Sequence, residues 1–204
     1  MTDSPAYSPT ATTLGYYAEH ADDFARSTVD VEFSEMQARF EALLSPGARI
    51  LDLGCGSGRD TLRFLRDGYD VTPTDGSPEL CAIAEQLTGV PVRHQLFQEL
   101  DDVDAYDGVW ACSSILHLPR PELADVLRCI ARALHAGGVL YTSFKYGKDE
   151  GVRDGRYFTD FTEATLRAFL AAVPELSVIE LWTSSDVRPG REAETWLNVL
   201  LRKA

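Results

Sequence analysis

The sequence predicts an α/β fold with a mainly parallel sheet. From residue 48 onward, short apolar runs alternate with segments of helical periodicity, an order typical of βαβ units. The first apolar run leads into a glycine-rich turn, and the second ends in an acidic residue. A length of 204 residues, with 45% hydrophobic and 25% charged residues, suits one globular domain.

The N-terminal region has its own composition. Residues 1–13 are rich in Pro, Ser and Thr and contain almost no large apolar side chains, so we expect a flexible tail there. Residues 14–45 are predicted to form a helical cap of two helices, the second opened by the capping-box spacing of Ser34 and Gln37. Residues 46–204 are predicted to form the α/β core, so that residues 14–204 make one domain.

Within this core the apolar pattern predicts seven strands and four helices. Pro and Gly mark several boundaries, such as Pro78 at the start of a helix and Gly137 after another. The predicted strands cover residues 48–53, 71–74, 90–97, 106–113, 139–144, 176–182 and 195–201. The predicted helices cover residues 59–68, 78–87, 123–134 and 162–173.

The most informative segment is the turn after the first predicted strand. Three alternate glycines, Gly54, Gly56 and Gly58, enclose Cys55 and Ser57 and lead into a helix. Glycine permits a tight turn and a close approach of the backbone to a ligand, and the helix beyond offers free N–H groups. The G-x-G-x-G spacing differs from the G-x-G-x-x-G of dinucleotide sites.

Two acidic residues accompany this turn. Asp52, just before it, suits a ligand that carries an ammonium and a sulfonium better than it suits a diphosphate, which favours S-adenosylmethionine over NAD. Asp75 ends the second predicted strand, 23 positions after Asp52 and near the offset of about 20 at which an acid accepts ribose hydroxyls. An NAD-dependent oxidoreductase remains a less favoured alternative.

Residues 48–145 resemble the core of the class I S-adenosylmethionine-dependent methyltransferases. The resemblance implies a doubly wound, Rossmann-like sheet of seven strands, the last antiparallel, which binds S-adenosylmethionine and releases S-adenosylhomocysteine. It implies that the three glycines approach the methionine part and that Asp75 holds the ribose. The usual Asp at the adenine is absent, so either the Gln98 side chain or a nearby backbone group is the candidate for the adenine amine, with Phe97 against the ring. The other cofactor candidates are Tyr17, Asp52, Cys55, Ser57, Gly76, Ser77, Glu99, Ala111, Cys112 and Ser113.

The sequence says less about the residues that would bind the methyl acceptor. His117 follows the fourth predicted strand and is a candidate general base, or a residue that only packs at the start of a helix. Tyr16 and Tyr17 are candidates for a lid, with core packing as the alternative. Lys145, Arg156 and Tyr157 are candidates for an acceptor pocket, with a solvated loop as the alternative.

Three stretches, residues 106–110, 116–119 and 196–201, are similar to bacterial small-molecule methyltransferases near the tellurite-resistance group. The resemblance implies a small-molecule acceptor, such as a chalcogen or another small nucleophile. Methyl transfer from a sulfonium is an in-line displacement, so the protein chiefly supplies alignment and a dry pocket. The alternative is a non-catalytic protein that binds S-adenosylmethionine or stabilises a partner.

Charge and composition narrow the partners. The net charge of −13 disfavours nucleic acid, because nucleic-acid affinity depends largely on Lys and Arg. The sequence has no apolar stretch of membrane-spanning length and no apparent signal peptide, so we expect a cytoplasmic protein without a membrane partner. The four cysteines have no metal-ligand spacing, and no metal site is predicted. We expect a monomer or a homodimer.

Overall fold

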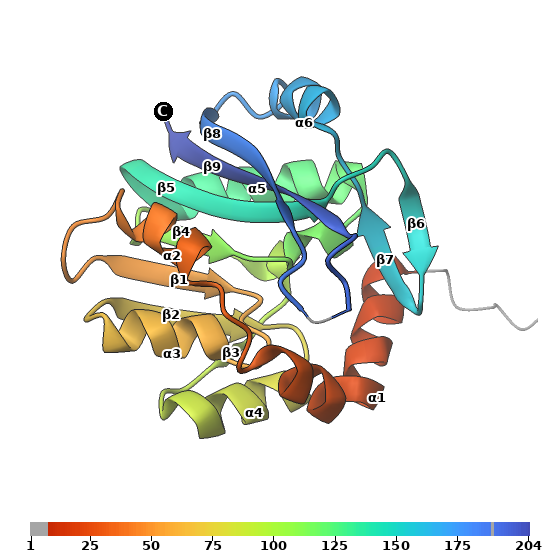
Figure 1. Cartoon of the computed structure of the whole chain (residues 1–204). Coiled ribbons are helices and arrows are strands. Elements are labelled where there is room, and N and C mark those ends of the chain that lie inside the picture. The colour runs from red at the N-terminus through yellow and green to blue at the C-terminus, as the bar shows by residue number, and fades with distance from the viewer. Residues whose placement is uncertain (1–7, 189) are drawn as a thin grey trace, which may run out of the picture.

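The computed structural model describes residues 8–188 and 190–204. Its centre is a seven-stranded sheet in the order β3-β2-β1-β4-β5-β9-β8, and a two-stranded hairpin lies beside it (Figure 1). The strands of the sheet are β1 (Arg49–Leu53), β2 (Asp70–Asp75), β3 (Arg93–His94), β4 (Tyr106–Ala111), β5 (Leu134–Lys145), β8 (Leu176–Ser185) and β9 (Thr195–Lys203). The hairpin consists of β6 (Glu150–Arg153) and β7 (Arg156–Thr159).

The pairing confirms the predicted doubly wound sheet. The first five strands pair in parallel, whereas β9 runs antiparallel to both β5 and β8. The chain moves outward from β1 to β2 and β3, and then returns to place β4 on the other side of β1. In sheets of this kind, ligands bind at the carboxyl ends of the strands where the order reverses.

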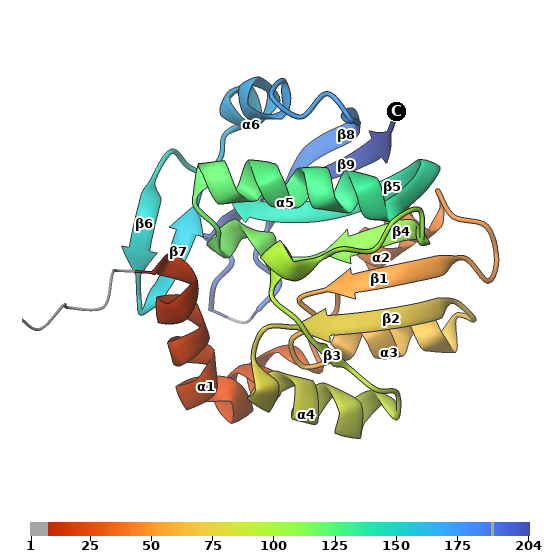
Figure 2. The same ribbon diagram turned by 180° about the vertical axis from the view of Figure 1, so that it is seen from behind.

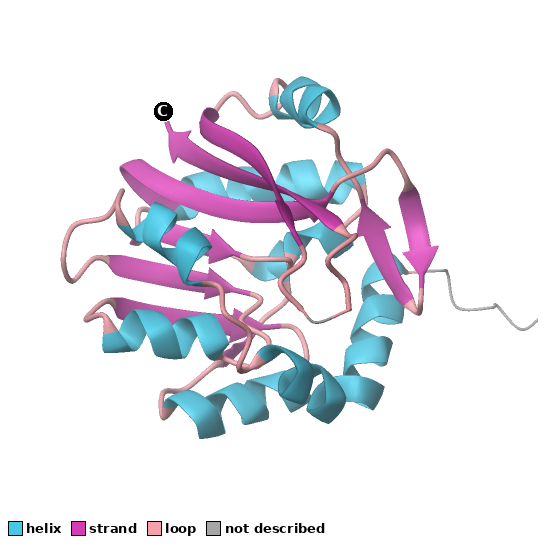
Figure 3. Cartoon of the chain, in the orientation of Figure 1, coloured by secondary structure: helices cyan, strands magenta, loops and turns pink. Residues whose placement is uncertain are grey.

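Helices cover both faces of the sheet (Figures 2 and 3). The helices are α1 (Pro9–Thr28), α2 (Ser34–Glu41), α3 (Arg59–Arg66), α4 (Pro78–Thr88), α5 (Arg120–Ala133) and α6 (Glu163–Leu170), with short 3₁₀ turns η1 (Phe97–Glu99) and η2 (Ile115–His117). Phe40 of α2 and Phe64 of α3 pack around Trp110 on one face, while Leu127 of α5 and Leu166 of α6 belong to the apolar cluster on the other. The apolar stripes predicted from the sequence therefore face the sheet.

The N-terminal helix starts earlier than predicted. The Ser8 hydroxyl accepts a hydrogen bond from the amide of Ala11, and Pro9 at the first helical position has the φ angle that a helix needs. The predicted tail is therefore wrong for residues 9–13, which are helical. Thr13 is buried, and its Oγ1 accepts a hydrogen bond from the amide of Tyr157 at 3.0 Å. Residues 1–7 lie outside the described residues.

The structure corrects two further predictions. The third strand, predicted over residues 90–97, is limited to β3, because Pro91 lacks an N–H for the ladder and residues 97–99 form the η1 turn. The hairpin β6-β7 replaces the loop predicted after the fifth strand. Its turn consists of Asp154 and Gly155, both with positive φ (48° and 77°), as a two-residue type I′ hairpin turn requires.

Candidate functional site

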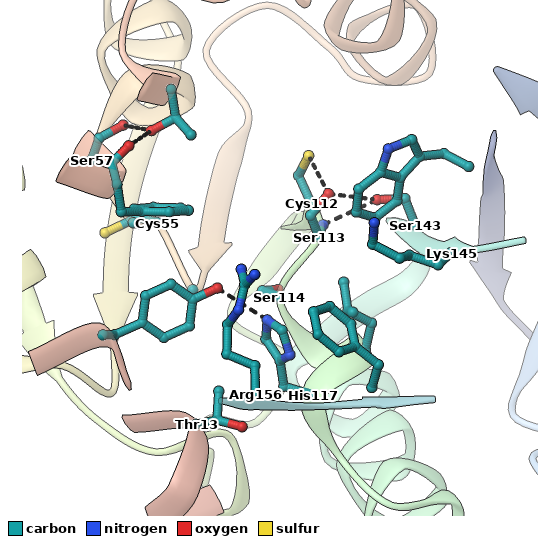
Figure 4. A pocket seen from close by; sticks show the side chains of 18 of the residues that line it. Thr13, Cys55, Ser57, Cys112, Ser113, Ser114, His117, Ser143, Lys145 and Arg156 are labelled. Carbon is teal, nitrogen blue, oxygen red and sulfur yellow. Dashed lines mark hydrogen bonds between the residues drawn. The ribbon is translucent and has the colours of Figure 1, made fainter. Parts of the chain in front are cut away.

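A cavity of about 320 Å³ lies at the carboxyl ends of β1, β2 and β4, where the strand order reverses. The turn after β1 forms one wall, and η2, β7 and the end of β5 form the opposite wall (Figure 4). Helix α1 contributes Thr13 and Tyr17 to the lining. The volume is at the lower end of the range for small-molecule and cofactor sites.

The glycine-rich turn is folded so that only glycine fits. Gly54, Gly56 and Gly58 have φ angles of +83°, +56° and +82°. A Cβ on Gly54 would lie 2.5 Å from the Cβ of Ser114, and one on Gly56 would lie 3.1 Å from the ring of Phe24. The amides of Gly54 and Cys55 both donate to the carbonyl oxygen of Thr74 at 2.9 Å, which ties the turn to β2.

Asp75 links this turn to the next helix. One carboxylate oxygen accepts the amide of Gly56 at 2.9 Å, and the other accepts the amide of Ser77 at 2.9 Å. Burial raises the pKa of Asp75, and these backbone hydrogen bonds oppose that shift. A carboxylate has about four acceptor positions, so two bonds leave capacity for hydroxyl groups of a ligand in the cavity that Asp75 lines.

A buried charge network lies behind the turn. Arg59 binds both carboxylate oxygens of Asp60, at 2.8 and 2.9 Å, and Asp60 also accepts from Gln37 and from the indole of Trp110, both at 2.8 Å. Arg59 and Asp60 reach the cavity wall. Asp52 instead accepts from the Thr61 hydroxyl at 2.5 Å, and burial together with the charge of Asp60 raises its pKa to about 8.

His117 is held at both ring nitrogens. Its Nδ1 lies 2.6 Å from the carbonyl oxygen of Tyr157, which can only accept, so Nδ1 carries the proton. Nε2 is then free to accept from the hydroxyl of Tyr17 on α1, at 3.1 Å. Burial lowers the pKa of His117 to about 4, so the ring is neutral at pH 7, and protonating it there would cost roughly 4 kcal/mol.

Ionic side chains form the far wall. Lys145 pairs with Glu194 and its Nζ lies 5.2 Å from the ring centroid of Trp196. Arg156 lies beside His117 in Figure 4, and its guanidinium carbon is 4.5 Å from the ring centroid of Tyr16. At the end of β4, the amide of Ser113 donates to the hydroxyl of Ser143 at 3.0 Å.

Comparison with known proteins finds similarity to methyltransferases. Residues 50–138 match the family model described as a methyltransferase domain. In fold, the chain is similar to the 1,6-didemethyltoxoflavin-N1-methyltransferase of Burkholderia thailandensis, solved with 1,6-didemethyltoxoflavin and S-adenosylhomocysteine; identity is 25%, the TM-score is 0.80, and 100% of this chain and 93% of that chain are covered. Residues 50–138 are thus similar to a methyltransferase domain, and the whole chain has the fold of a solved methyltransferase.

Curated relatives match this chain over part of their length. The ubiquinone biosynthesis O-methyltransferase of Xanthomonas campestris pv. campestris (strain B100) is 36% identical over 105 residues, which is 48% of this chain and 43% of the relative. The putative methyltransferase YqeM of Bacillus subtilis is 31% identical over 117 residues, which is 52% of this chain and 47% of the relative. The chain therefore spans less than half the length of these two relatives.

The structure brings most of the predicted methyltransferase site residues together. Fourteen of them line the cavity, namely Tyr17, Gly54, Cys55, Gly56, Ser57, Asp75, Gly76, Phe97, Gln98, Cys112, Ser113, His117, Lys145 and Arg156. Gln98 donates to Glu122 at 2.8 Å, so its amide has a protein partner.

Among the described helices, none combines the length and the apolar character that a membrane span needs.

Seven predicted residues are not part of the cavity wall. Asp52 lies behind the turn, and Glu99 uses its carboxylate to accept the amide of Leu96 at 2.8 Å. Tyr16 packs against Arg156, and Tyr157 supplies its carbonyl to His117. The remaining three are Gly58, Ser77 and Ala111.

Several lining residues were missed by the sequence reasoning. Arg59 and Asp60 follow the third glycine directly, so their place at the start of the helix could have indicated them. No local signal indicates the lining residues that come from distant segments, namely Thr10, Thr13, Leu14, Phe24, Thr28, Leu96, Ser143, Asp186 and Asn198.

Proposed function

We propose that this protein binds S-adenosylmethionine in the cavity and transfers the methyl group to a small-molecule acceptor. The observation that carries the proposal is the double role of Asp75. Its carboxylate holds the G-x-G-x-G turn through Gly56 and lines the same cavity that extends to His117 and Arg156. Support also comes from the structural relative of Burkholderia thailandensis, which was solved with S-adenosylhomocysteine.

The residues of the site fit this cofactor. The turn at Gly54 and Gly56 has no side chains, which leaves room for the amino-acid part, and Asp75 has acceptor capacity for the ribose hydroxyls. Phe97 offers an apolar ring for the adenine, beside Gln98. When bound, S-adenosylmethionine supplies a methyl group activated by a positively charged sulfur.

The protein's own contribution is alignment and exclusion of water. Helix α1 covers the cavity, and its Tyr17 is joined to His117 on η2 by a hydrogen bond of 3.1 Å. Because both ring nitrogens of His117 are engaged and its pKa is low, we assign it the positioning of Tyr17 rather than removal of a proton from the acceptor. The proposed acceptor is therefore one that needs little help to become a nucleophile.

We also propose that the methyl acceptor is a small organic molecule. The structural relative of Burkholderia thailandensis is a 1,6-didemethyltoxoflavin-N1-methyltransferase, and the cavity here has an aromatic and ionic far wall suited to a small organic molecule. The net charge of −13 supports an acceptor other than nucleic acid. We further propose that the protein acts in the cytoplasm, as a monomer or a homodimer.

Calorimetry tests the cofactor directly. We expect S-adenosylhomocysteine and S-adenosylmethionine to bind and NAD not to bind. Asp75→Asn removes the charge that accepts the ribose hydroxyls and should weaken S-adenosylhomocysteine binding at least tenfold, or about 1.4 kcal/mol. Asp101→Asn, at an exposed position, should leave the affinity unchanged.

Two results would contradict the proposal. One is that NAD binds as tightly as S-adenosylhomocysteine. The other is that neither S-adenosylmethionine nor S-adenosylhomocysteine gives a heat of binding at millimolar concentration. Circular dichroism of Asp75→Asn checks that the variant is folded. Formation of S-adenosylhomocysteine in a screen of small acceptors separates an enzyme from a protein that only binds the cofactor.

A further inference from the structure

In the described part of the cavity wall opposite the glycine-rich turn, one cationic side chain, that of Arg156, has no carboxylate partner. The other cations there have carboxylate partners: Lys145 with Glu194, Arg153 with Asp160, Arg188 with Asp186 and Arg191 with Glu194. Among residues 8–188 and 190–204, no carboxylate oxygen lies within 4.0 Å of the Arg156 guanidinium. Its Nε is buried and has no hydrogen-bond partner in the described chain.

The Arg156 guanidinium is held in place by aromatic rings. Its central carbon lies 4.5 Å from the ring centroid of Tyr16 and 5.2 Å from that of Phe158. Arg156 belongs to β7, which pairs with β6 over its whole length, so its backbone is fixed as well. A planar guanidinium fixed in this way loses little freedom when it binds a carboxylate-like group with two parallel hydrogen bonds.

Two neighbours of Arg156 in the cavity wall, His117 and Tyr17, carry no negative charge at neutral pH. His117 is neutral because burial lowers its pKa to about 4, and burial also raises the pKa of Tyr17. Asp154, two residues earlier, also lines the cavity, but it is exposed in the hairpin turn and its carboxylate lies more than 4.0 Å from the Arg156 guanidinium. In the described chain the Arg156 guanidinium thus has no carboxylate partner within 4.0 Å, although Asp75 and Asp154 line other parts of the same cavity.

We propose that the acceptor end of the cavity binds a planar organic anion through the guanidinium of Arg156. This inference rests on the proposed function for its use as an acceptor site. A partly buried cation without a partner is costly, and an anionic ligand would supply the missing partner. The rings of Phe158 and Trp196, which line the same end, suit a flat ligand.

The inference agrees with the positioning role assigned to His117. An acceptor that attacks through its anionic group has already lost its proton, so no side chain must remove one. The neutral Tyr17–His117 pair then serves to close the cavity beside the anion. Arg156 is thereby a residue that determines acceptor specificity.

Three ligands of similar shape and different charge test whether the site at Arg156 prefers an anion. Benzoate, benzamide and benzamidine are planar and nearly the same size, and they are anionic, neutral and cationic, respectively. Binding of each probe to protein saturated with S-adenosylhomocysteine is measured by ligand-observed NMR or calorimetry. We expect benzoate to bind at least tenfold more tightly than benzamide, and benzamidine not to bind.

Arg156→Gln should reduce the preference for benzoate over benzamide to less than twofold and leave the affinity for S-adenosylhomocysteine within twofold. Arg167→Gln, at an exposed position on α6, is the matched control and should retain the preference. Arg156→Lys keeps the charge without the planar fork and should retain an intermediate preference.

Three outcomes would overturn the inference. They are equal binding of benzoate and benzamide to the unaltered protein, an unchanged preference in Arg156→Gln, and a loss of S-adenosylhomocysteine affinity in Arg156→Gln, which would place Arg156 at the cofactor. The first comparison needs no variant, so it decides even if Arg156→Gln does not fold. If S-adenosylhomocysteine does not bind at all, the proposed function fails, and the ranking of the three probes on the free protein still tests the anion site.

Discussion

Gly54 and Gly68 have nearly the same backbone conformation, with φ of +83° and +88°, but different surroundings. A Cβ on Gly68 would meet nothing within 4 Å, whereas one on Gly54 would collide with Ser114. Gly68→Ala should therefore cost about 1–2 kcal/mol of stability for the left-handed conformation alone. Gly54→Ala should cost about 1–3 kcal/mol more because of the collision.

Urea denaturation of the two glycine variants measures this difference, and calorimetry with S-adenosylhomocysteine supplies the second measurement. We expect Gly68→Ala to bind normally and Gly54→Ala to lose binding at least tenfold. Equal stability losses, or normal binding by Gly54→Ala, would show that the turn tolerates a side chain.

Asp52 gives a second prediction at the scale of single residues. Its pKa is raised to about 8 in the folded protein, above the ordinary value near 4, so the folded state binds the proton more tightly than the unfolded state. The stability that Asp52 contributes is present below pH 4 and is lost as the pH rises toward 8. Asp52→Asn cannot ionise, and its amide oxygen can still accept from Thr61.

We therefore expect the stability of Asp52→Asn relative to the unaltered protein to increase by at least about 1 kcal/mol between pH 5 and pH 8. Urea denaturation at the two pH values gives the comparison, with exposed Asp22→Asn as the control. If the difference in the free energy of unfolding between Asp52→Asn and the unaltered protein does not change with pH, Asp52 ionises in the folded protein as it does in water.

Single residues also show where sequence reasoning about the site succeeds. The glycines and Asp75 were predictable because their spacing within one βαβ unit fixes where they meet. The pattern could not show that Asp52 points behind the turn, because that depends on a hydrogen bond to Thr61 in the next helix. Nor could it show that Tyr157 acts through its backbone carbonyl.

At the scale of elements, α1 is joined to η2 in the cavity wall by the hydrogen bond between Tyr17 and His117. Tyr17→Phe removes this bond, which is worth about 1 kcal/mol, and should speed amide hydrogen exchange in α1 about fivefold. Tyr16→Phe is the matched control, because Tyr16 contacts Arg156 through its ring, and phenylalanine keeps a ring. Equal exchange in the two variants would indicate that other contacts hold α1.

The helices and strands were predicted to different extents. Long amphipathic segments such as α5 were found where expected, because their apolar stripe must face the sheet. The β6-β7 hairpin was missed, although the dipeptide Asp154-Gly155 is a recognised signal for a type I′ turn. The helical start of α1 was missed because residues 9–13 are stabilised by a cap at Ser8 and by contact with β7 rather than by apolar content.

For the whole molecule, the sheet order and the place of the site were predictable, but the far wall of the cavity was not. The alternation of strands and helices fixes the carboxyl edge where β1 and β4 lie side by side. The far wall combines η2, β7, the end of β5 and the segment before β9, which are separated by tens of residues. Its ion pairs depend on tertiary contacts that no local pattern records.

The position of β9 has a consequence for biosynthesis. This strand is the last to be synthesised among those described, yet it lies inside the sheet, hydrogen-bonded to β5 on one side and to β8 on the other. Its Asn198 also accepts the buried Tyr141 hydroxyl at 2.8 Å. A nascent chain that has not yet released β9 from the ribosomal tunnel leaves β5 and β8 unjoined, so the sheet is completed only after residues 195–203 emerge.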